Sequence, residues 1–296
     1  MKGVKLKQIN HFEIQAPPMP KKSTLPAKGH ELSLTCYSNI LCCAKRKSGK
    51  SWAVFNLVKE CAGKETRVIA FCSTLYKDDC WNGIRKYLKQ KNIDFTGYTS
   101  LYPDGQDILS DLIDDLNDEA KEREENDEEE SEKEKEPEKD DIDAIMEKIR
   151  THGMAEYLEM CKEEKRKPKK PKFQEPEIMI ILDDIGNQLK TPSLLKLLTW
   201  NRHFRAKVII STQYLCHLLP ESRKMIDLWL IFAGHPEAKL KAIYDDADIN
   251  IPFEDFQRLY KKATKHKHSF LYIDSERGEF RKNFNQKFII KPPEEE

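Results

Sequence analysis

The fold is decided by residues 39–51, which read NILCCAKRKSGKS. The stretch Asn39 to Cys43, apolar from Ile40 onward, is typical of a buried strand, and a basic loop separates it from a helix expected to begin near Lys50. Residues 44–51 nearly match the Walker A pattern G-x-x-x-x-G-K-[ST], which lies between a strand and a helix. The stretch therefore predicts a phosphate-binding loop at the start of an α/β domain.

Each part of this loop has an expected role. Backbone N–H groups at the turn and helix start form a concave anion site. Lys50 is expected to reach the β- and γ-phosphates of ATP, and the Ser51 hydroxyl to ligate Mg²⁺. The expected nucleotide-binding residues are Ala44, Lys45, Arg46, Lys47, Ser48, Gly49, Lys50 and Ser51. Ala44 departs from the pattern, which has glycine there, and a negative φ would make alanine acceptable.

A second motif follows the apolar run Ile178 to Leu182, which ends in Asp183 and Asp184. At the carboxyl end of a buried strand, Asp183 is expected to bind Mg²⁺ and Asp184 to orient or deprotonate the attacking water. Glutamate is commoner at the second position, so the shorter aspartate requires a closer water. Two aspartates after a strand can also form a turn or helix cap, but the upstream Walker A match favours the Walker B interpretation.

A third strand, Lys207 to Ser211, is followed by Thr212 and Gln213. Because the carboxyl ends of parallel strands converge on a ligand crevice, both side chains are expected to face the γ-phosphate as a sensor. The alternative is an ordinary cap at a strand end.

The rest of the chain alternates short apolar strands with helices, which predicts a mostly parallel sheet with helices on both faces. Further strands are expected at 67–72, 95–98, 228–233, 269–273 and 279–284, and helices at 78–91, 193–202, 237–247 and 253–264. The last two strands are expected to form a hairpin around Arg277 and Gly278.

The expected organisation is an N-terminal arm with an edge strand at 11–15 (residues 1–37), one P-loop ATPase domain (38–290) and a tail (291–296). A charged and helical insertion, 107–172, interrupts the domain. Within it, 118–141 has too little apolar surface to offset its ordering entropy, so we expect disorder, with a solvated helix as the alternative.

Charge is distributed unevenly along the 296 residues. Lysine plus arginine and aspartate plus glutamate number 51 each, but residues 111–143 hold 19 acids and 5 bases. The remainder, with 46 bases and 32 acids, is basic and suits a polyanionic partner such as DNA.

The eight cysteines lack C-x-x-C spacing, and the first ten residues lack the apolar core of a signal peptide, so reduced thiols in a cytosol-like compartment are expected. The apolar run at 178–182 is too short to span a bilayer. Trp52 and Phe55 share a helix face and are interpreted as core residues. His266 and His268 have no ligand-bearing neighbours in sequence, which disfavours a metal site.

The order of these motifs resembles the FtsK–HerA superfamily, and in particular the genome-packaging ATPases of large double-stranded DNA viruses, virophages and Polinton-like elements. The resemblance covers roughly 38–233 apart from the insertion. Beyond the two Walker motifs it is carried by Asn201-Arg202-His203, Ser211-Thr212-Gln213 and Leu219-Pro220-Glu221-Ser222-Arg223. The acidic insertion and Ala44 have no counterpart in that pattern.

The resemblance implies a RecA/FtsK-like core that binds ATP and Mg²⁺ and forms a ring with ATP at the subunit interfaces. It implies an arginine acting on a neighbour's nucleotide, for which Arg202 and Arg223 are the candidates. It also implies double-stranded DNA and a capsid or portal-vertex protein as partners, in the host cytoplasm or nucleus or associated with the virion. The alternatives are a cellular or mobile-element translocase or helicase and a nucleotide-binding scaffold without hydrolysis.

Overall fold

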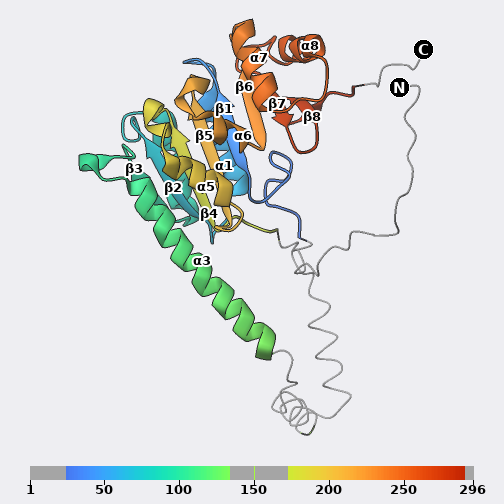
Figure 1. Cartoon of the computed structure of the whole chain (residues 1–296). Coiled ribbons are helices and arrows are strands. Elements are labelled where there is room, and N and C mark those ends of the chain that lie inside the picture. Colours follow the sequence, from blue (N-terminus) through green and yellow to red (C-terminus); the bar gives the residue numbers. More distant parts are fainter. Residues whose placement is uncertain (1–24, 134–149, 151–172, 291–296) are drawn as a thin grey trace, which may run out of the picture.

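The computed structural model describes residues 25–133, 150 and 173–290, and its central element is one sheet (Figure 1). In the described residues the sheet has nine strands in the order β3-β2-β4-β5-β1-β6-β7-β8-β9. The strands are β1 Asn39–Cys43, β2 Arg67–Cys72, β3 Phe95–Tyr98, β4 Ile178–Asp183, β5 Ala206–Thr212, β6 Leu228–Phe232, β7 Phe270–Asp274, β8 Glu279–Lys282 and β9 Gln286–Lys287. The α-helices are α1 Lys50–Cys61, α2 Asp79–Lys91, α3 Ile108–Lys133, α5 Pro192–Trp200, α6 Pro220–Lys224, α7 Glu237–Asp246 and α8 Phe253–Ala263.

In the sheet order, the neighbouring strands β3, β2, β4, β5, β1 and β6 pair in parallel. The strands β7, β8 and β9 continue the sheet with antiparallel pairing. This confirms the expected mostly parallel α/β fold. The strand β5 lies between β1 and β4, so the strands that lead into the two Walker motifs flank the strand that leads into Gln213. Because all three strands are parallel, their carboxyl ends lie at the same edge of the sheet.

Both faces of the sheet are covered, as expected. Successive side chains of a strand point to opposite faces. In β1, Ile40 packs on the face covered by α1 and α2, and Leu41 packs on the face covered by α3, α5, α7 and α8. All five residues of β1 and all six of β4 are buried, which explains why these strands are continuous apolar runs without polar alternation.

The expected helices and the C-terminal hairpin are present with small shifts at their ends. The hairpin joins β7 to β8, and Gly278 in its turn has a φ of 61°, which favours glycine. The short helix α6, the strand β9 and three single-turn 3₁₀ helices (η1 Pro103–Gly105, η2 Gly186–Leu189, η3 Leu215–His217) were not expected. Elements this short carry too few residues for a periodic signal.

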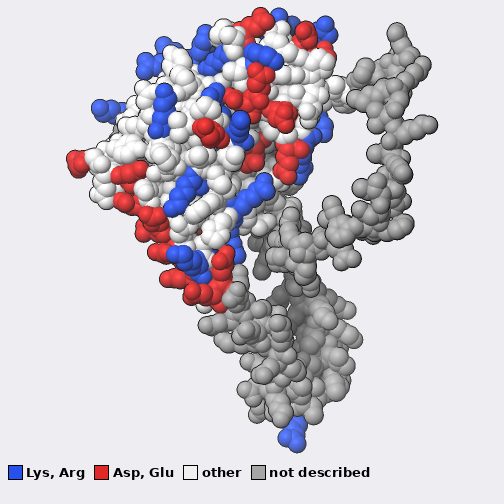
Figure 2. All heavy atoms as spheres, viewed as in Figure 1, with Lys and Arg blue, Asp and Glu red and all other residues white. Residues whose placement is uncertain are grey.

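The structure differs from the expectation at the start of the insertion. Helix α3 begins at Ile108, and its Leu109, Ile113 and Leu116 are buried against the sheet, so the insertion begins as part of the domain core. The helix continues to Lys133, so for 118–133 the helical alternative replaces the expected disorder, while 134–141 lie outside the described residues. Figure 1 shows α3 extending away from the sheet, and Figure 2 shows acidic side chains gathered along it.

Residues 25–38 are held to the sheet by a buried lysine that sequence patterns did not indicate. Lys207 of β5 is fully buried, and its Nζ donates to Ser33 Oγ at 2.7 Å, Thr35 O at 2.9 Å and Ser38 Oγ at 2.9 Å. Burial lowers the pKa of Lys207, because nearby neutral oxygens replace water only partly. The expected strand at 11–15 and the tail lie outside the described residues. In the described part, no helix combines the length and apolar character needed to cross a membrane.

Candidate active site

The phosphate loop connects β1 to α1 in the expected place. Gly49 caps α1 with a φ of 95°, and Lys47 also has a positive φ, 62°. Ser48 Oγ donates to Lys45 O at 2.7 Å and closes the turn. Ala44 is not among the described residues with positive φ, and it is fully buried, with its N–H donating to Thr212 O at 3.1 Å. The backbone therefore does not require glycine at position 44.

Lys50 lies between the two aspartates of the second motif. Its Nζ is 3.5 Å from Asp183 Oδ1 and 3.4 Å from Asp184 Oδ1, and the residue is only 8% exposed. Among the described residues, neither Lys50 Nζ nor Asp183 Oδ1 has a hydrogen-bond partner. Buried charged groups normally have such partners, so this pair fits a site completed by a ligand. A nucleotide phosphate would satisfy the ammonium group, and Mg²⁺ would satisfy the carboxylate oxygen.

Asp183 is held by a residue that the sequence analysis missed. Trp81 of α2 is buried, and its Nε1–H donates to Asp183 Oδ2 at 2.8 Å. With Oδ2 engaged, Oδ1 is the oxygen turned toward Lys50. The two residues are 102 positions apart, so no local pattern could indicate the contact.

Asp184 has a backbone conformation that is uncommon outside glycine. Its φ is 53°, and its N–H donates to Ser211 O at 3.0 Å, at the end of β5. Gln213 Nε2 donates to both carboxylate oxygens of Asp184, at 2.9 and 3.0 Å. The left-handed conformation costs on the order of 1 kcal/mol and is often found at functional sites. The Asp184 side chain is 37% exposed, so it is accessible to water beside Lys50.

The side chains of Thr212 and Gln213 have different partners. The Thr212 hydroxyl lies 3.0 Å from His217 Nδ1 and donates to Tyr214 O at 3.2 Å, whereas Gln213 reaches Asp184. Thr212 is 1% exposed and its hydroxyl is hydrogen-bonded within the chain, and its role as a γ-phosphate sensor stays a prediction. Neighbouring residues of an extended chain point in opposite directions, which is why only one of the two reaches the carboxylates.

His235, after β6, and Lys239, in the first turn of α7, contact the ends of β1 and β5 at the site, and no motif indicated these contacts. Lys239 Nζ donates to Gln213 O at 2.7 Å, and His235 Nε2 lies 3.2 Å from Cys43 O. Burial, with Lys239 and Lys45 nearby, lowers the pKa of His235 to about 4, so its ring is neutral at pH 7. A neutral ring with Nε2 protonated donates to the Cys43 carbonyl at the end of β1.

A pocket of about 490 Å³ lies over the phosphate loop. Four lysines line it together with two acids and Ser51 at the start of α1; the charged residues are Lys45, Lys47, Lys50, Lys267, Asp78 and Asp79. In the described part of the chain, no three His, Cys, Asp or Glu residues cluster as metal ligands. A Mg²⁺ ion bound here would therefore take most of its ligands from nucleotide phosphates and water, as this ion commonly does.

The two candidate arginines lie away from this edge. Arg202 precedes β5 and its Nη2 is 3.9 Å from Asp227 Oδ1, while Arg223 in α6 pairs with Asp246 at 2.8 Å. Arg202 and Asp227 adjoin the amino-terminal ends of β5 and β6, and a seven-residue strand such as β5 spans roughly 20 Å. Within one chain the structure therefore does not bring Arg202 to the phosphate loop.

The expectation for Trp52 is wrong. Phe55 packs against Tyr87 with ring centroids 5.9 Å apart, but Trp52 is 65% exposed and lines the mouth of the phosphate pocket. The buried face of α1 is formed by Ala53, Val54, Leu57, Val58 and Cys61, and Trp52 lies outside this stripe.

The parallel sheet, the phosphate loop and the carboxylates at the strand ends define the fold of a P-loop nucleoside triphosphatase. Residues 143–248 match the family described as Poxvirus A32 protein. The match includes Asp183, Asp184 and Gln213, and it leaves out the phosphate loop. It confirms the resemblance to viral packaging ATPases of the FtsK–HerA type that the order of motifs indicated. No curated protein matches the sequence.

Solved structures similar to this chain include the genome packaging NTPase B204 from Sulfolobus turreted icosahedral virus 2 in complex with AMPPCP. The identity is 14%, with 83% of this chain and 97% of that chain covered and a TM-score of 0.47. The DNA-packaging ATPase B204 from Sulfolobus turreted icosahedral virus is 16% identical, with 82% of this chain and 95% of that chain covered and a TM-score of 0.42. The cytoplasmic domain of the Thermomonospora curvata type VII secretion ATPase EccC is 12% identical, with 79% of this chain and 24% of that chain covered and a TM-score of 0.37.

Proposed function

We propose that this protein hydrolyses ATP and uses the reaction to move double-stranded DNA into a viral capsid. The observation that carries the hydrolytic part is the buried Lys50 ammonium group, 3.5 and 3.4 Å from two strand-end carboxylates and without a hydrogen-bond partner in the described structure. A triphosphate seated on the loop amides would supply the missing partner.

In this proposal each residue of the site has a role that follows from its position. The loop residues 44–51 bind the phosphates, and Lys50 neutralises charge on the β- and γ-phosphates. Ser51 and the free oxygen of Asp183 would hold Mg²⁺, which when bound neutralises charge that develops on the phosphate oxygens. Asp184 accepts a hydrogen bond from the attacking water, and Gln213 fixes the direction of that carboxylate.

An arginine from a neighbouring subunit completes the site in this proposal. Arg202 is the better-placed candidate, because its side chain is 67% exposed and its contact with Asp227 is long. Arg223 is 18% exposed and tightly paired with Asp246, so it would have to break that ion pair before acting in a neighbour. Such a shared site requires a ring or another oligomer of this chain, and this chain alone would hydrolyse ATP slowly.

Movement of DNA rests on the resemblance to packaging ATPases and on the match to a poxvirus family. Contacts would be made to DNA phosphates, with little sequence preference. The face in Figure 2 carries basic side chains interspersed with acidic ones, so a DNA contact there would involve scattered lysines and arginines. A capsid or portal-vertex protein in the infected host cell would be the assembly partner.

Turnover of Mg-ATP measured with and without linear double-stranded DNA tests the proposal. We expect DNA to stimulate the wild type and Lys50→Ala to be inactive in both conditions, because the buried ammonium group is lost. Lys59→Ala, an exposed position on the same helix, is the control and should behave as wild type. Equal turnover by Lys50→Ala and wild type would overturn the assignment of the site.

A further inference from the structure

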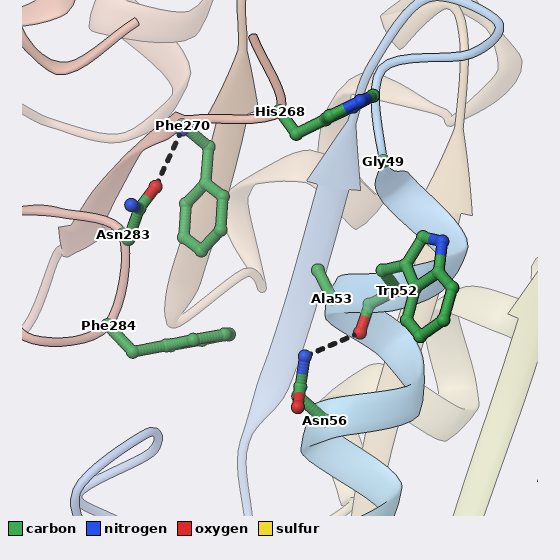
Figure 3. A pocket seen from close by; sticks show the side chains of 8 residues that line it. All are labelled: Gly49, Trp52, Ala53, Asn56, His268, Phe270, Asn283 and Phe284. Carbon is green, nitrogen blue, oxygen red and sulfur yellow. Dashed lines mark hydrogen bonds between the residues drawn. The ribbon is translucent and has the colours of Figure 1, made fainter. Parts of the chain in front are cut away.

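A second pocket adjoins the phosphate pocket. It has a volume of about 440 Å³ and shares Gly49, Trp52 and His268 with its neighbour. Figure 3 shows its two sides, with Trp52, Ala53 and Asn56 coming from α1, Phe270 from β7 and Phe284 from the turn after β8. The two pockets therefore form one site with a basic compartment and an aromatic compartment on either side of Gly49.

The aromatic compartment has the shape and chemistry of a base-binding site. The buried Ala53 leaves room against α1, and Phe284 forms edge contacts with Phe270 and Tyr272 at 5.0 and 6.3 Å, which holds its ring in place. Trp52 stands at the mouth with 65% of its surface exposed. Flat aromatic surfaces of this kind stack on a nucleobase, and each stacked base contributes on the order of 1–3 kcal/mol.

Two asparagine side chains in this pocket are oriented by backbone groups. Asn56 Nδ2 donates to Trp52 O at 2.9 Å, so its Oδ1 remains as an acceptor. Asn283 Oδ1 accepts from the Phe270 N–H at 3.1 Å, so its Nδ2 remains as a donor. Since a backbone carbonyl needs a donor and a backbone N–H needs an acceptor, neither amide can be flipped without losing its bond.

We infer that this pocket binds the adenine ring of the nucleotide and that Asn56 selects adenine over guanine. The inference rests on the proposed function, because it assumes that a nucleoside triphosphate binds the phosphate loop. The Asn56 oxygen accepts from the 6-amino group of adenine, and the Asn283 amide donates to a neighbouring ring nitrogen. Guanine has an oxygen at position 6, which would face the Asn56 oxygen, acceptor against acceptor.

Calorimetric binding of three probes to the full chain tests this inference. The probes are the ATP analogue AMPPCP, its guanine counterpart and inorganic tripolyphosphate, each with Mg²⁺. We expect Trp52→Ala to weaken AMPPCP binding roughly tenfold, by loss of stacking. Asn56→Ala should weaken it roughly fivefold and bring the two nucleotides to similar affinity. Neither variant should change tripolyphosphate binding, because the phosphate loop is intact.

The exposed Trp200 of α5 provides the matched control, since it is 41% exposed and lines neither compartment. Trp200→Ala should bind all three probes as wild type does. Unchanged AMPPCP affinity and unchanged preference in both pocket variants would overturn the inference while the proposed function stands. Failure of the wild type to bind either AMPPCP or tripolyphosphate would overturn the proposed function and the inference together.

Discussion

Replacing Trp81 by phenylalanine tests whether its contact with Asp183 positions the carboxylate. The change removes the indole N–H that donates to Asp183 Oδ2 at 2.8 Å and leaves that oxygen buried without its partner. A hydrogen bond to a charged group contributes about 1.5–3 kcal/mol, so the free energy of unfolding should fall by a similar amount. For a domain of this size the melting temperature should fall by about 3–10 °C.

Trp81→Phe should also change the Mg²⁺ dependence of ATP turnover, beyond its effect on the free energy of unfolding. Without the Trp81 contact the carboxylate can rotate, and Oδ1 is no longer held toward Lys50. Loss of a side chain that orients a metal ligand typically weakens metal binding about 10–100-fold. ATP turnover measured against Mg²⁺ concentration, at a temperature where both proteins are folded, should therefore require much more Mg²⁺ in Trp81→Phe.

Trp229→Phe is the matched control for this variant. Trp229 of β6 is equally buried, but its indole N–H has no hydrogen-bond partner among the described residues. Its replacement removes a similar volume and no hydrogen bond, so the Mg²⁺ dependence should stay unchanged. The same Mg²⁺ dependence in Trp81→Phe, Trp229→Phe and wild type would refute the positioning role of Trp81.

Four further predictions follow from the site and the core. Asp184→Asn should bind AMPPCP normally and hydrolyse ATP about 10²–10⁴-fold more slowly; an unchanged rate would exclude Asp184 as the group that orients water. Mixing Asp184→Asn with Arg202→Ala or Arg223→Ala subunits should restore activity if the arginine acts across an interface, and co-assembly without recovery would argue against it. Because the pKa of His235 falls to about 4 on folding, stability should decline as the pH drops from 6.5 to about 4; an identical pH profile of thermal unfolding in His235→Gln would contradict this. Leu116→Ala should lower the free energy of unfolding by about 2–5 kcal/mol in urea titrations, and a change under 0.5 kcal/mol would show that α3 is not part of the core.

The parallel sheet and its site edge could be predicted because their signals are local. The apolar runs before Ala44 and Asp183 mark strands that are buried on both faces, and each run is followed at once by the residues that face the ligand. The strand order could not be predicted from the sequence, because the pairing of β5 between β1 and β4 depends on contacts between distant segments.

The missed features share a physical cause, which is tertiary contact over long sequence separations. Trp81 reaches Asp183 across 102 positions, and Lys239 reaches Gln213 from the first turn of α7. For α3, composition could not decide between disorder and a solvated helix at 118–141, because acidic residues dominate the count. The contact of α3 with the core is made by a few apolar residues before that stretch, such as Leu116, spaced along one helix face.

The central claim is that ATP hydrolysis at this site drives movement along double-stranded DNA. Displacement of a triplex-forming oligonucleotide from linear duplex DNA measures such movement directly. We predict displacement by the wild type with Mg-ATP, none with AMPPCP, and none by Lys50→Ala or Asp184→Asn. Rapid ATP turnover without displacement on DNA that the protein binds, or displacement that persists in Lys50→Ala, would contradict the claim.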